Sequence, residues 1–143
     1  MILVVAEQKD GKLNRATWEA IAAAQQLAGG GAVAIVVLGA NVGGVAAELS
    51  AAQAQEVVAV EAPALEPYTS DGFTAALVHV VGELKPATVV LPHTYQTRDF
   101  APKLAARLDR ALVTDVTAIK MVNGSAAFVR PMCQGKLTAD VVP

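Results

Sequence analysis

The chain has 143 residues, of which 54% are hydrophobic and 4% aromatic, and its formal net charge is −2. This size and composition allow one sizeable hydrophobic core, which excludes a disordered protein. The charges are scattered and form no basic stripe, so we expect no binding to nucleic acid.

The sequence also limits where the protein can reside. Its longest apolar runs, such as residues 32–38, are too short to cross a bilayer, so we expect no membrane insertion. The first residues lack the charged start and long apolar stretch of a signal peptide. The single cysteine, Cys133, excludes an internal disulfide. We therefore expect a cytoplasmic protein.

Short Val-rich segments alternate with helical patterns in the first part of the chain. Strands are predicted over 2–6, 32–38, 57–60 and 87–91, because each segment is short and largely apolar, as in a buried parallel sheet. Helices are predicted between these strands. Their expected N-terminal caps are Asn14, Asn41 and Ser70, and the fourth helix is expected over 100–110.

This alternation predicts an α/β fold with a doubly wound, mostly parallel sheet and helices on both of its faces. We expect five strands in the order 3-2-1-4-5, an arrangement that resembles adenine-nucleotide-hydrolase-like proteins. The pattern changes after Leu112, where strands are predicted over 116–121, 126–130 and 136–142, and Asn123-Gly124 predicts a hairpin.

We therefore expect a single domain over 1–143, with a parallel α/β body at 1–112 and an antiparallel strand extension at 113–143. The sequence stops directly after the last predicted strand. We interpret this as either a truncated chain or a domain whose edge is completed elsewhere.

Ligands of a doubly wound sheet bind beyond the carboxyl ends of its strands, where the strand order reverses. In the predicted order this point lies between the first and fourth strands, so the loops at 7–10 and 92–99 meet there. A helix begins after the second loop, and free N–H groups at a helix start favour an anion. The candidates for holding an anion or a nucleotide phosphate are Glu7, His93, Thr94, Thr97, Arg98 and Asp99.

A structural interpretation of the same loop stays open beside this one. Asp99 or Thr97 would cap the fourth helix, and Pro102 would fall in its first turn, where no N–H is required. In that case the loop at 92–99 serves the helix and binds no ligand.

No complete catalytic or metal-binding set is visible in the sequence. His93 has no acid or nucleophile at a recognisable spacing, and two histidines alone cannot form a zinc site. Cys133 lacks a second thiol or an activating cation. There is no dinucleotide fingerprint and no P-loop. The sequence therefore predicts neither an enzyme nor a metal site.

A family resemblance rests mainly on residues 93–116. The run HTYQTRDFAPKLAARL at 93–108, with VTDV at 113–116, resembles the N-terminal domain of the electron-transfer flavoprotein alpha subunit. The segments LVVAE at 3–7 and FVRP at 128–131 are similar to that family's first strand and antiparallel extension. Thr97 stands where the family usually has a glycine.

The resemblance implies a scaffold domain that docks on a related beta subunit. The resulting heterodimer would carry one FAD and pass electrons from dehydrogenases to an acceptor. In the family, FAD is held mainly by a C-terminal domain of the alpha subunit, whose motifs are absent from these 143 residues. The chain alone would then hold no cofactor, and in isolation it would self-associate through the uncovered partner surface.

Two other functions stay open. A small adenine-nucleotide-binding module that resembles universal stress proteins shares the predicted topology, but it would need a glycine-rich phosphate loop after the fourth strand. A hydrolase acting at the His93 loop would need a nucleophile and a base within reach of each other.

Overall fold

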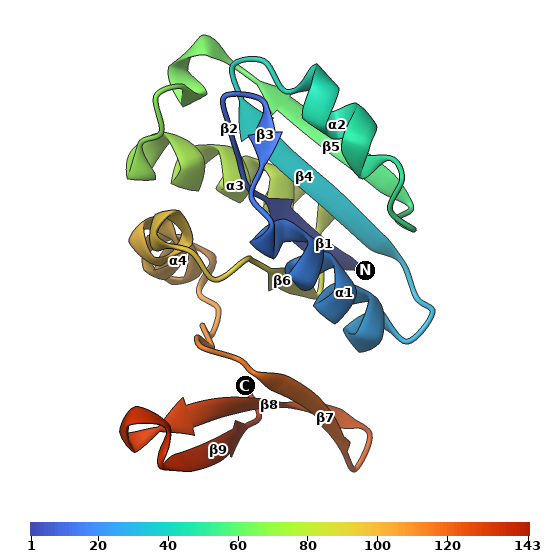
Figure 1. Ribbon diagram of the computed structural model, residues 1–143, viewed down its shortest axis with the longest axis vertical. Helices are drawn as coiled ribbons and strands as arrows, with labels where there is room; N and C mark the ends of the chain where they lie inside the picture. Colours follow the sequence, from blue (N-terminus) through green and yellow to red (C-terminus); the bar gives the residue numbers. More distant parts are fainter.

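Five consecutive apolar residues form the central strand of the molecule. In the computed structural model, which describes residues 1–143, β1 (Ile2–Ala6) is buried along its whole length. It pairs in parallel with β4 (Val33–Gly39) on one side and with β6 (Thr88–Val90) on the other. β5 (Glu56–Glu61) pairs in parallel with β4, which gives the order β5-β4-β1-β6 (Figure 1).

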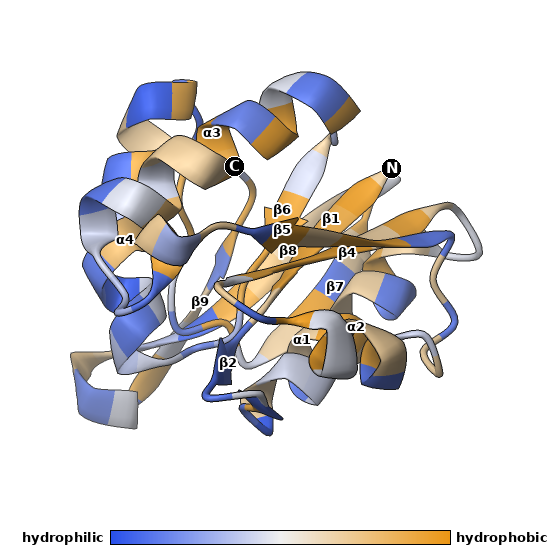
Figure 2. Cartoon of the chain, turned by 90° about the horizontal axis from the view of Figure 1, so that it is seen from above, coloured by the Kyte–Doolittle hydropathy of each residue, from blue (hydrophilic) through white to orange (hydrophobic).

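Helices cover both faces of this sheet because successive side chains of a strand point to opposite faces. Ile2, Val4 and Ala6 pack with α1 (Ala16–Ala28) and α2 (Gly43–Leu49). Leu3 and Val5 pack with α3 (Ser70–Leu84) and α4 (Tyr95–Leu108), whose Phe100 is fully buried. In Figure 2 the strands of the parallel sheet are mostly hydrophobic, whereas the helices alternate between hydrophobic and hydrophilic residues. The predicted doubly wound body with helices on both faces is therefore confirmed. None of the helices is long and apolar enough to span a membrane.

The predicted sheet of five strands is wrong, because the parallel sheet has only four. Residues 110–117, which follow α4, form neither helix nor strand. β7 (Ala118–Val122) then pairs antiparallel with β8 (Ser125–Met132), and β8 pairs with β9 (Leu137–Val141). These three strands form a separate sheet at one end of the molecule (Figure 1).

The turn between β7 and β8 explains this difference. Asn123 and Gly124 both adopt positive φ angles, 52° and 82°, as a tight hairpin requires, so the predicted hairpin is confirmed. β7 and β8 are separated by only two residues, so their pairing closes a much shorter loop than the pairing of β7 with β6 would. The outer edge of β6 is consequently left without a strand partner.

Two of the three expected helix caps are wrong. Asn14 does accept a hydrogen bond from the Ala16 N–H at 2.9 Å, although the residue directly before α1 is Arg15. At α2 the Val42 N–H donates to the Glu61 carboxylate at 3.1 Å, and at α3 the Thr69 hydroxyl accepts from the Gly72 N–H at 3.0 Å. Neither Asn41 nor Ser70 therefore caps its helix. The Glu61 carboxylate accepts from the free backbone N–H at the start of α2, and the Thr69 hydroxyl does so at the start of α3.

A small hairpin, unforeseen in the sequence, extends β1. β2 (Gln8–Lys9) and β3 (Lys12–Leu13) flank Asp10 and Gly11, which have φ angles of 53° and 79°. Asp-Gly is a strong hairpin signal, but strands of two residues are too short to show an apolar pattern. The short helical turns Pro63–Leu65 and Cys133–Gly135 complete the elements.

The hairpin places Gln8 in a buried polar contact with the end of β4. Gln8 Nε2 donates to the Leu38 carbonyl at 3.1 Å and to the Glu66 carboxylate at 3.2 Å, and its Oε1 accepts from the Gly11 N–H at 3.0 Å. Gly39 lies against this group. A Cβ at Gly39 would come within 2.5 Å of Gln8 Nε2 and 2.6 Å of Val42 Cγ1.

The Gly39→Ala variant should therefore be less stable than the wild type by about 1–3 kcal/mol, because the buried Gln8 amide must move. The matched control is Gly82→Ala in α3, where an added Cβ meets nothing within 4 Å. That variant should gain up to about 1 kcal/mol, since alanine is the better helix former. Urea denaturation of the three proteins measures both changes, and equal stabilities for the two variants would contradict the packing described at Gly39.

Candidate functional site

The polar residues that follow β1 and β6 meet at the carboxyl end of the parallel sheet. The Thr94 hydroxyl donates to Glu7 Oε1 at 2.6 Å. The Thr97 N–H donates to Thr94 Oγ1 at 3.1 Å, and the two threonine hydroxyl oxygens are 3.2 Å apart. The structure thus brings together three of the six candidate residues.

The start of α4 differs from the expectation. The helix begins at Tyr95 and not at 100, and its cap is Thr94, which has extended backbone angles of −135° and 165°. The expected caps Asp99 and Thr97 both lie inside the first turns, and Pro102 lies within the helix. The reason is local, because the Thr94 hydroxyl reaches the N–H three residues later, as a threonine cap does.

The electrostatics of this helix start are set by Glu7. Its carboxylate lies against the cap of α4, where a helix dipole favours a negative charge. The other carboxylate oxygen accepts from Asn14 Nδ2 at 3.1 Å. The backbone N–H of Glu7 donates to the buried Thr17 hydroxyl at 3.0 Å, which holds the residue in place. The Glu7 carboxylate therefore accepts from two side chains, Thr94 and Asn14, and places a negative charge beside the start of α4.

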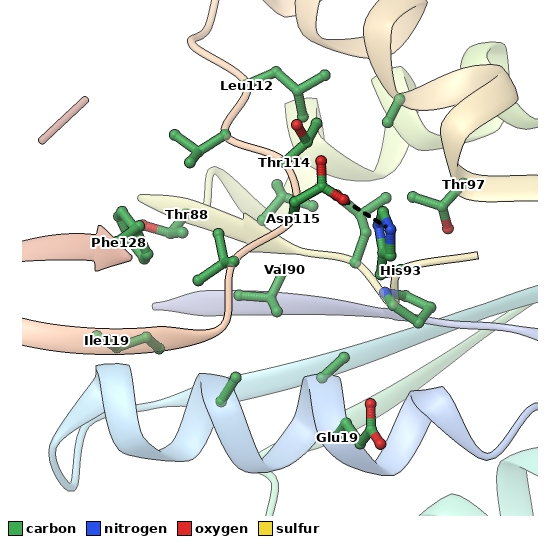
Figure 3. A pocket seen from close by; sticks show the side chains of 18 of the residues that line it. Glu19, Thr88, Val90, His93, Thr97, Leu112, Thr114, Asp115, Ile119 and Phe128 are labelled. Carbon is green, nitrogen blue, oxygen red and sulfur yellow. Dashed lines mark ion pairs between the residues drawn. The ribbon is translucent and has the colours of Figure 1, made fainter. Parts of the chain in front are cut away.

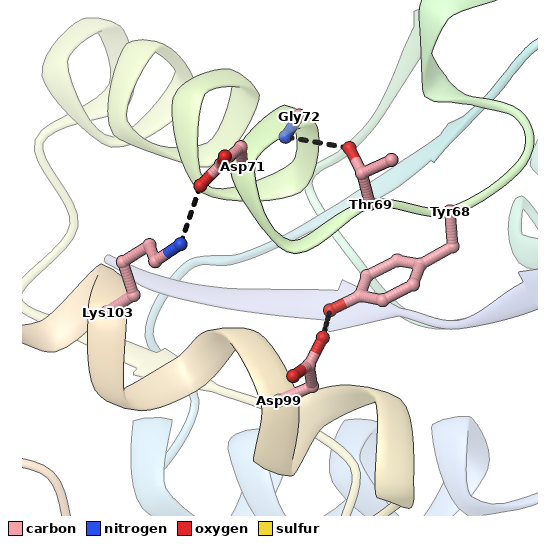
Figure 4. A network of polar contacts seen from close by, with 6 residues as sticks. All are labelled: Tyr68, Thr69, Asp71, Gly72, Asp99 and Lys103. Atoms are coloured by element: carbon pink, nitrogen blue, oxygen red, sulfur yellow. Dashed lines mark hydrogen bonds and ion pairs between the residues drawn. The ribbon is translucent and has the colours of Figure 1, made fainter.

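Asp99 lies on another face of α4 and joins that helix to the segment before α3. The Tyr68 hydroxyl donates to Asp99 Oδ2 at 2.7 Å (Figure 4). Burial, and then the neighbouring Asp99 carboxylate, raises the pKa of Tyr68. The Tyr68 ring packs edge-on against Phe73 with ring centres 4.8 Å apart. Asp99 thus stabilises the packing of the two helices.

A second contact between the same helices lies on the surface. Lys103 Nζ is 2.5 Å from Asp71 Oδ1 (Figure 4), and this hydrogen bond lowers the pKa of the Asp71 carboxyl group. Both side chains are solvated, so we assign the pair only a small contribution to stability.

His93 has an acidic partner that the sequence spacing did not reveal. His93 Nε2 is 3.0 Å from Asp115 Oδ1, and Arg130 Nη2 is 3.4 Å from the other oxygen of the same carboxylate. The sequence offered no acid at a recognisable spacing from His93, and the structure supplies the distant Asp115 as its partner. Asp115 lies beyond α4 in the irregular segment, so only the tertiary structure brings it to His93.

The His93–Asp115 pair lies in a cleft of about 640 Å³ between the body and the antiparallel sheet (Figure 3). Arg98 also lines this cleft, is exposed and forms no ion pair. No group of three or more His, Cys, Asp and Glu side chains could hold a metal ion. Many of the lining side chains are apolar and come from α1, β6 and the antiparallel sheet, among them Leu27, Val89, Ile119 and Phe128.

Replacing the cap of α4 gives a direct test of its role. Thr94→Ala should lower the free energy of unfolding by about 1–2 kcal/mol, because the Thr97 N–H and the Glu7 carboxylate both lose a partner. Thr94→Ser keeps the hydroxyl group and should stay within about 0.5 kcal/mol of the wild type. Thermal unfolding of the three proteins compares them, and equal losses for Ala and Ser would rule out the hydroxyl as the cause.

The contact of Tyr68 with Asp99 should make stability fall at alkaline pH. A raised pKa in the folded protein means that the stabilising contribution of Tyr68 is complete below about pH 10 and is lost as the pH rises further. Tyr68→Phe should cost about 1 kcal/mol at pH 8, and its disadvantage should shrink above about pH 10. Urea denaturation of both proteins from pH 8 to 11 measures this, and a constant difference would contradict the assignment.

Comparisons with known proteins agree with the resemblance of residues 93–116. The family model described as the electron transfer flavoprotein domain matches residues 2–143. The electron transfer flavoprotein subunit alpha of Bacillus subtilis is 37% identical over 141 residues, which cover 99% of this chain and 43% of that protein. The alpha subunit of Syntrophomonas wolfei is 33% identical over 138 residues, with 96% and 43% covered.

A third relative carries a different description. The acryloyl-CoA reductase electron transfer subunit beta of Anaerotignum propionicum is 36% identical over 118 residues, which cover 81% of this chain and 32% of that protein. The chain thus spans less than half the length of these relatives, and it aligns with the N-terminal part of the alpha subunits. The predicted resemblance is confirmed, and the chain belongs to the electron transfer flavoprotein domain family.

Proposed function

We propose that this chain is the scaffold and partner-docking region of an electron-transfer flavoprotein alpha subunit. It would support electron transfer through an FAD held mainly by a part of the alpha subunit outside the matched region. In this proposal the chain is an electron-carrier component and not an enzyme. The body at 1–112 forms the framework, and the extension at 113–143 provides much of the docking surface.

The observation that carries the proposal is the position of the exposed apolar side chains. Seven of the ten large hydrophobic residues that are exposed lie between 112 and 142, although this segment is less than a quarter of the chain. An apolar surface concentrated in this way is typical of a protein interface. The seven are Leu112, Val116, Met121, Val122, Met132, Leu137 and Val142.

The register of the antiparallel sheet collects several of these side chains on one face. Ile119 is paired with Phe128, and Met132 is paired with Leu137, so these residues share a face with Met121. Ile119 and Phe128 line the cleft beside the body. Met121 is 66% exposed and Leu137 is 62% exposed. We refer to the paired residues Met132 and Leu137 as the apolar patch, and Met121 lies at the other end of the same face, beyond Phe128 and Arg130.

A sheet needs a second layer over its apolar face to be stable. The body supplies this layer only beside Ile119 and Phe128, which leaves the apolar patch uncovered. Family membership suggests the occupant, a related beta subunit of the same flavoprotein. The complete heterodimer would then bind the dehydrogenase donors. The isolated chain would self-associate through the same patch.

The geometry at the carboxyl end of the sheet supports the placement of FAD elsewhere. The Glu7 carboxylate lies beside the start of α4, where its negative charge would repel a phosphate. The same contact disfavours the alternative of a small adenine-nucleotide-binding module. The hydrolase alternative lacks support too, because none of the threonine hydroxyl groups that line the cleft is hydrogen-bonded to His93.

The chain should form a complex with the beta subunit of its own organism when the two are co-expressed, and neither this complex nor the chain alone should show flavin absorbance. Leu137→Asp should weaken the complex at least about tenfold, since it places a charge in the apolar patch. The matched control, Ala47→Asp, puts the same charge on an exposed position of α2 and should bind like the wild type.

Size-exclusion chromatography with absorbance detection measures both the formation of the complex and the presence of flavin in each peak. A chain that is yellow by itself would contradict the placement of FAD in another part of the subunit. Equal binding by Leu137→Asp and the wild type would contradict the apolar patch as the docking surface.

A further inference from the structure

We propose that Asp115 is a pH-sensitive latch that holds the antiparallel sheet in position against the parallel body. The latch consists of three side chains, His93, Asp115 and Arg130. Asp115 lies in the irregular segment 110–117, which is the covalent connection between the two sheets. This proposal concerns the chain by itself and does not depend on the proposed function.

Each side of the latch belongs to a different part of the molecule. His93 follows β6 of the body, and its Nε2 is 3.0 Å from Asp115 Oδ1 (Figure 3). Arg130 lies on β8 of the antiparallel sheet, and its Nη2 is 3.4 Å from Asp115 Oδ2. The carboxylate therefore ties the body to the antiparallel sheet through two ion pairs in series.

The backbone of Asp115 supports a positioning role. Its φ angle is 56°, a left-handed conformation that few residues other than glycine, asparagine and aspartate adopt easily. Asp115 is thus a residue that tolerates this bend and also carries the required charge. Backbone conformations of this kind are often found where a side chain must be aimed.

Few other polar contacts join the two parts. Gln26 Nε2 of α1 donates to the Ile119 carbonyl at 3.5 Å, a long and neutral hydrogen bond. Between the body and the sheet lies the open cleft, so apolar packing across it is incomplete. Each of the two ion pairs is solvated and weak, but they are the charged contacts that link the body to the antiparallel sheet.

Only one of the two ion pairs can respond to pH near neutrality. Arg130 keeps its charge at all pH values of interest, and the charge of a histidine ordinarily changes between about pH 5 and 8. The charged groups that face the cleft beside His93 are Asp115 from the segment, Arg98 from α4, Glu19 from α1 and Arg130 from β8. When His93 is neutral, its contact with Asp115 loses the attraction between opposite charges and only a hydrogen bond remains, while Asp115 stays paired with Arg130.

A distance measurement tests the latch. Cys133, the only cysteine, is exposed in the turn between β8 and β9 and accepts a spin label. A second label is placed on the body through Glu83→Cys, at an exposed position of α3. Double electron–electron resonance on this labelled chain then reports the position of the antiparallel sheet relative to the body at about pH 5.5 and 8.5.

We expect one narrow distance distribution at low pH and a broader one at high pH. Solvated ion pairs are weak, so the population of the displaced sheet should rise about two- to fivefold. Asp115→Asn and His93→Gln should give the broad distribution at both pH values. Asparagine tolerates the left-handed backbone as well as aspartate does, so the first variant removes only the charge.

The matched control is Asp109→Asn. Asp109 also has a left-handed backbone, with a φ angle of 52°, but forms no ion pair. It should behave like the wild type at both pH values. Identical distributions for the wild type and Asp115→Asn would overturn the proposal, and so would a pH response that persists in His93→Gln. Thermal unfolding checks that each variant is folded before labelling.

Discussion

The burial of β1 on both of its faces is the constraint on which the rest of this structure depends. Leu3 and Val4 are both fully buried although they point to opposite faces of the sheet. Such a strand must lie in the middle of a sheet with a helical layer on each side. Two pairs of helices supply these layers, and polar side chains are left to the ends of the strands. The contact of Glu7 with Thr94 arises there, because the carboxyl ends of β1 and β6 lie side by side.

The elements of the body could be predicted because their signals are local. An apolar run such as Ile2–Ala6 needs no knowledge of the fold to be recognised as a buried strand. Helix starts were harder, since Thr69 and Ser70 are adjacent and both can cap a helix, and only the backbone angles decide between them. The fifth parallel strand was wrong because strand pairing is not local, and the hairpin at Asn123 offered β7 a nearer partner.

In the candidate site, too, the arrangement of the loops could be predicted, whereas the contacts between distant side chains could not. The juxtaposition of the loops after the first and fourth strands followed from topology, and Glu7 and Thr94 do meet. Residue types alone could not show that Glu7 would face the helix start as an internal anion, nor that Asp99 would bind Tyr68. The partner of His93 could not be predicted either, because Asp115 lies beyond α4 in the sequence and comes close to His93 only in the folded chain. Side-chain pairing across elements depends on tertiary distances that sequence spacing does not contain.

The central claim is that the antiparallel sheet docks a partner subunit while the body serves as its framework. Hydrogen–deuterium exchange of the chain, with and without the beta subunit, tests this most directly. The account predicts that amides of residues 118–141 gain protection when the beta subunit is present, and that those of α2 do not. Protection confined to α2, or no change anywhere in the chain, would contradict it.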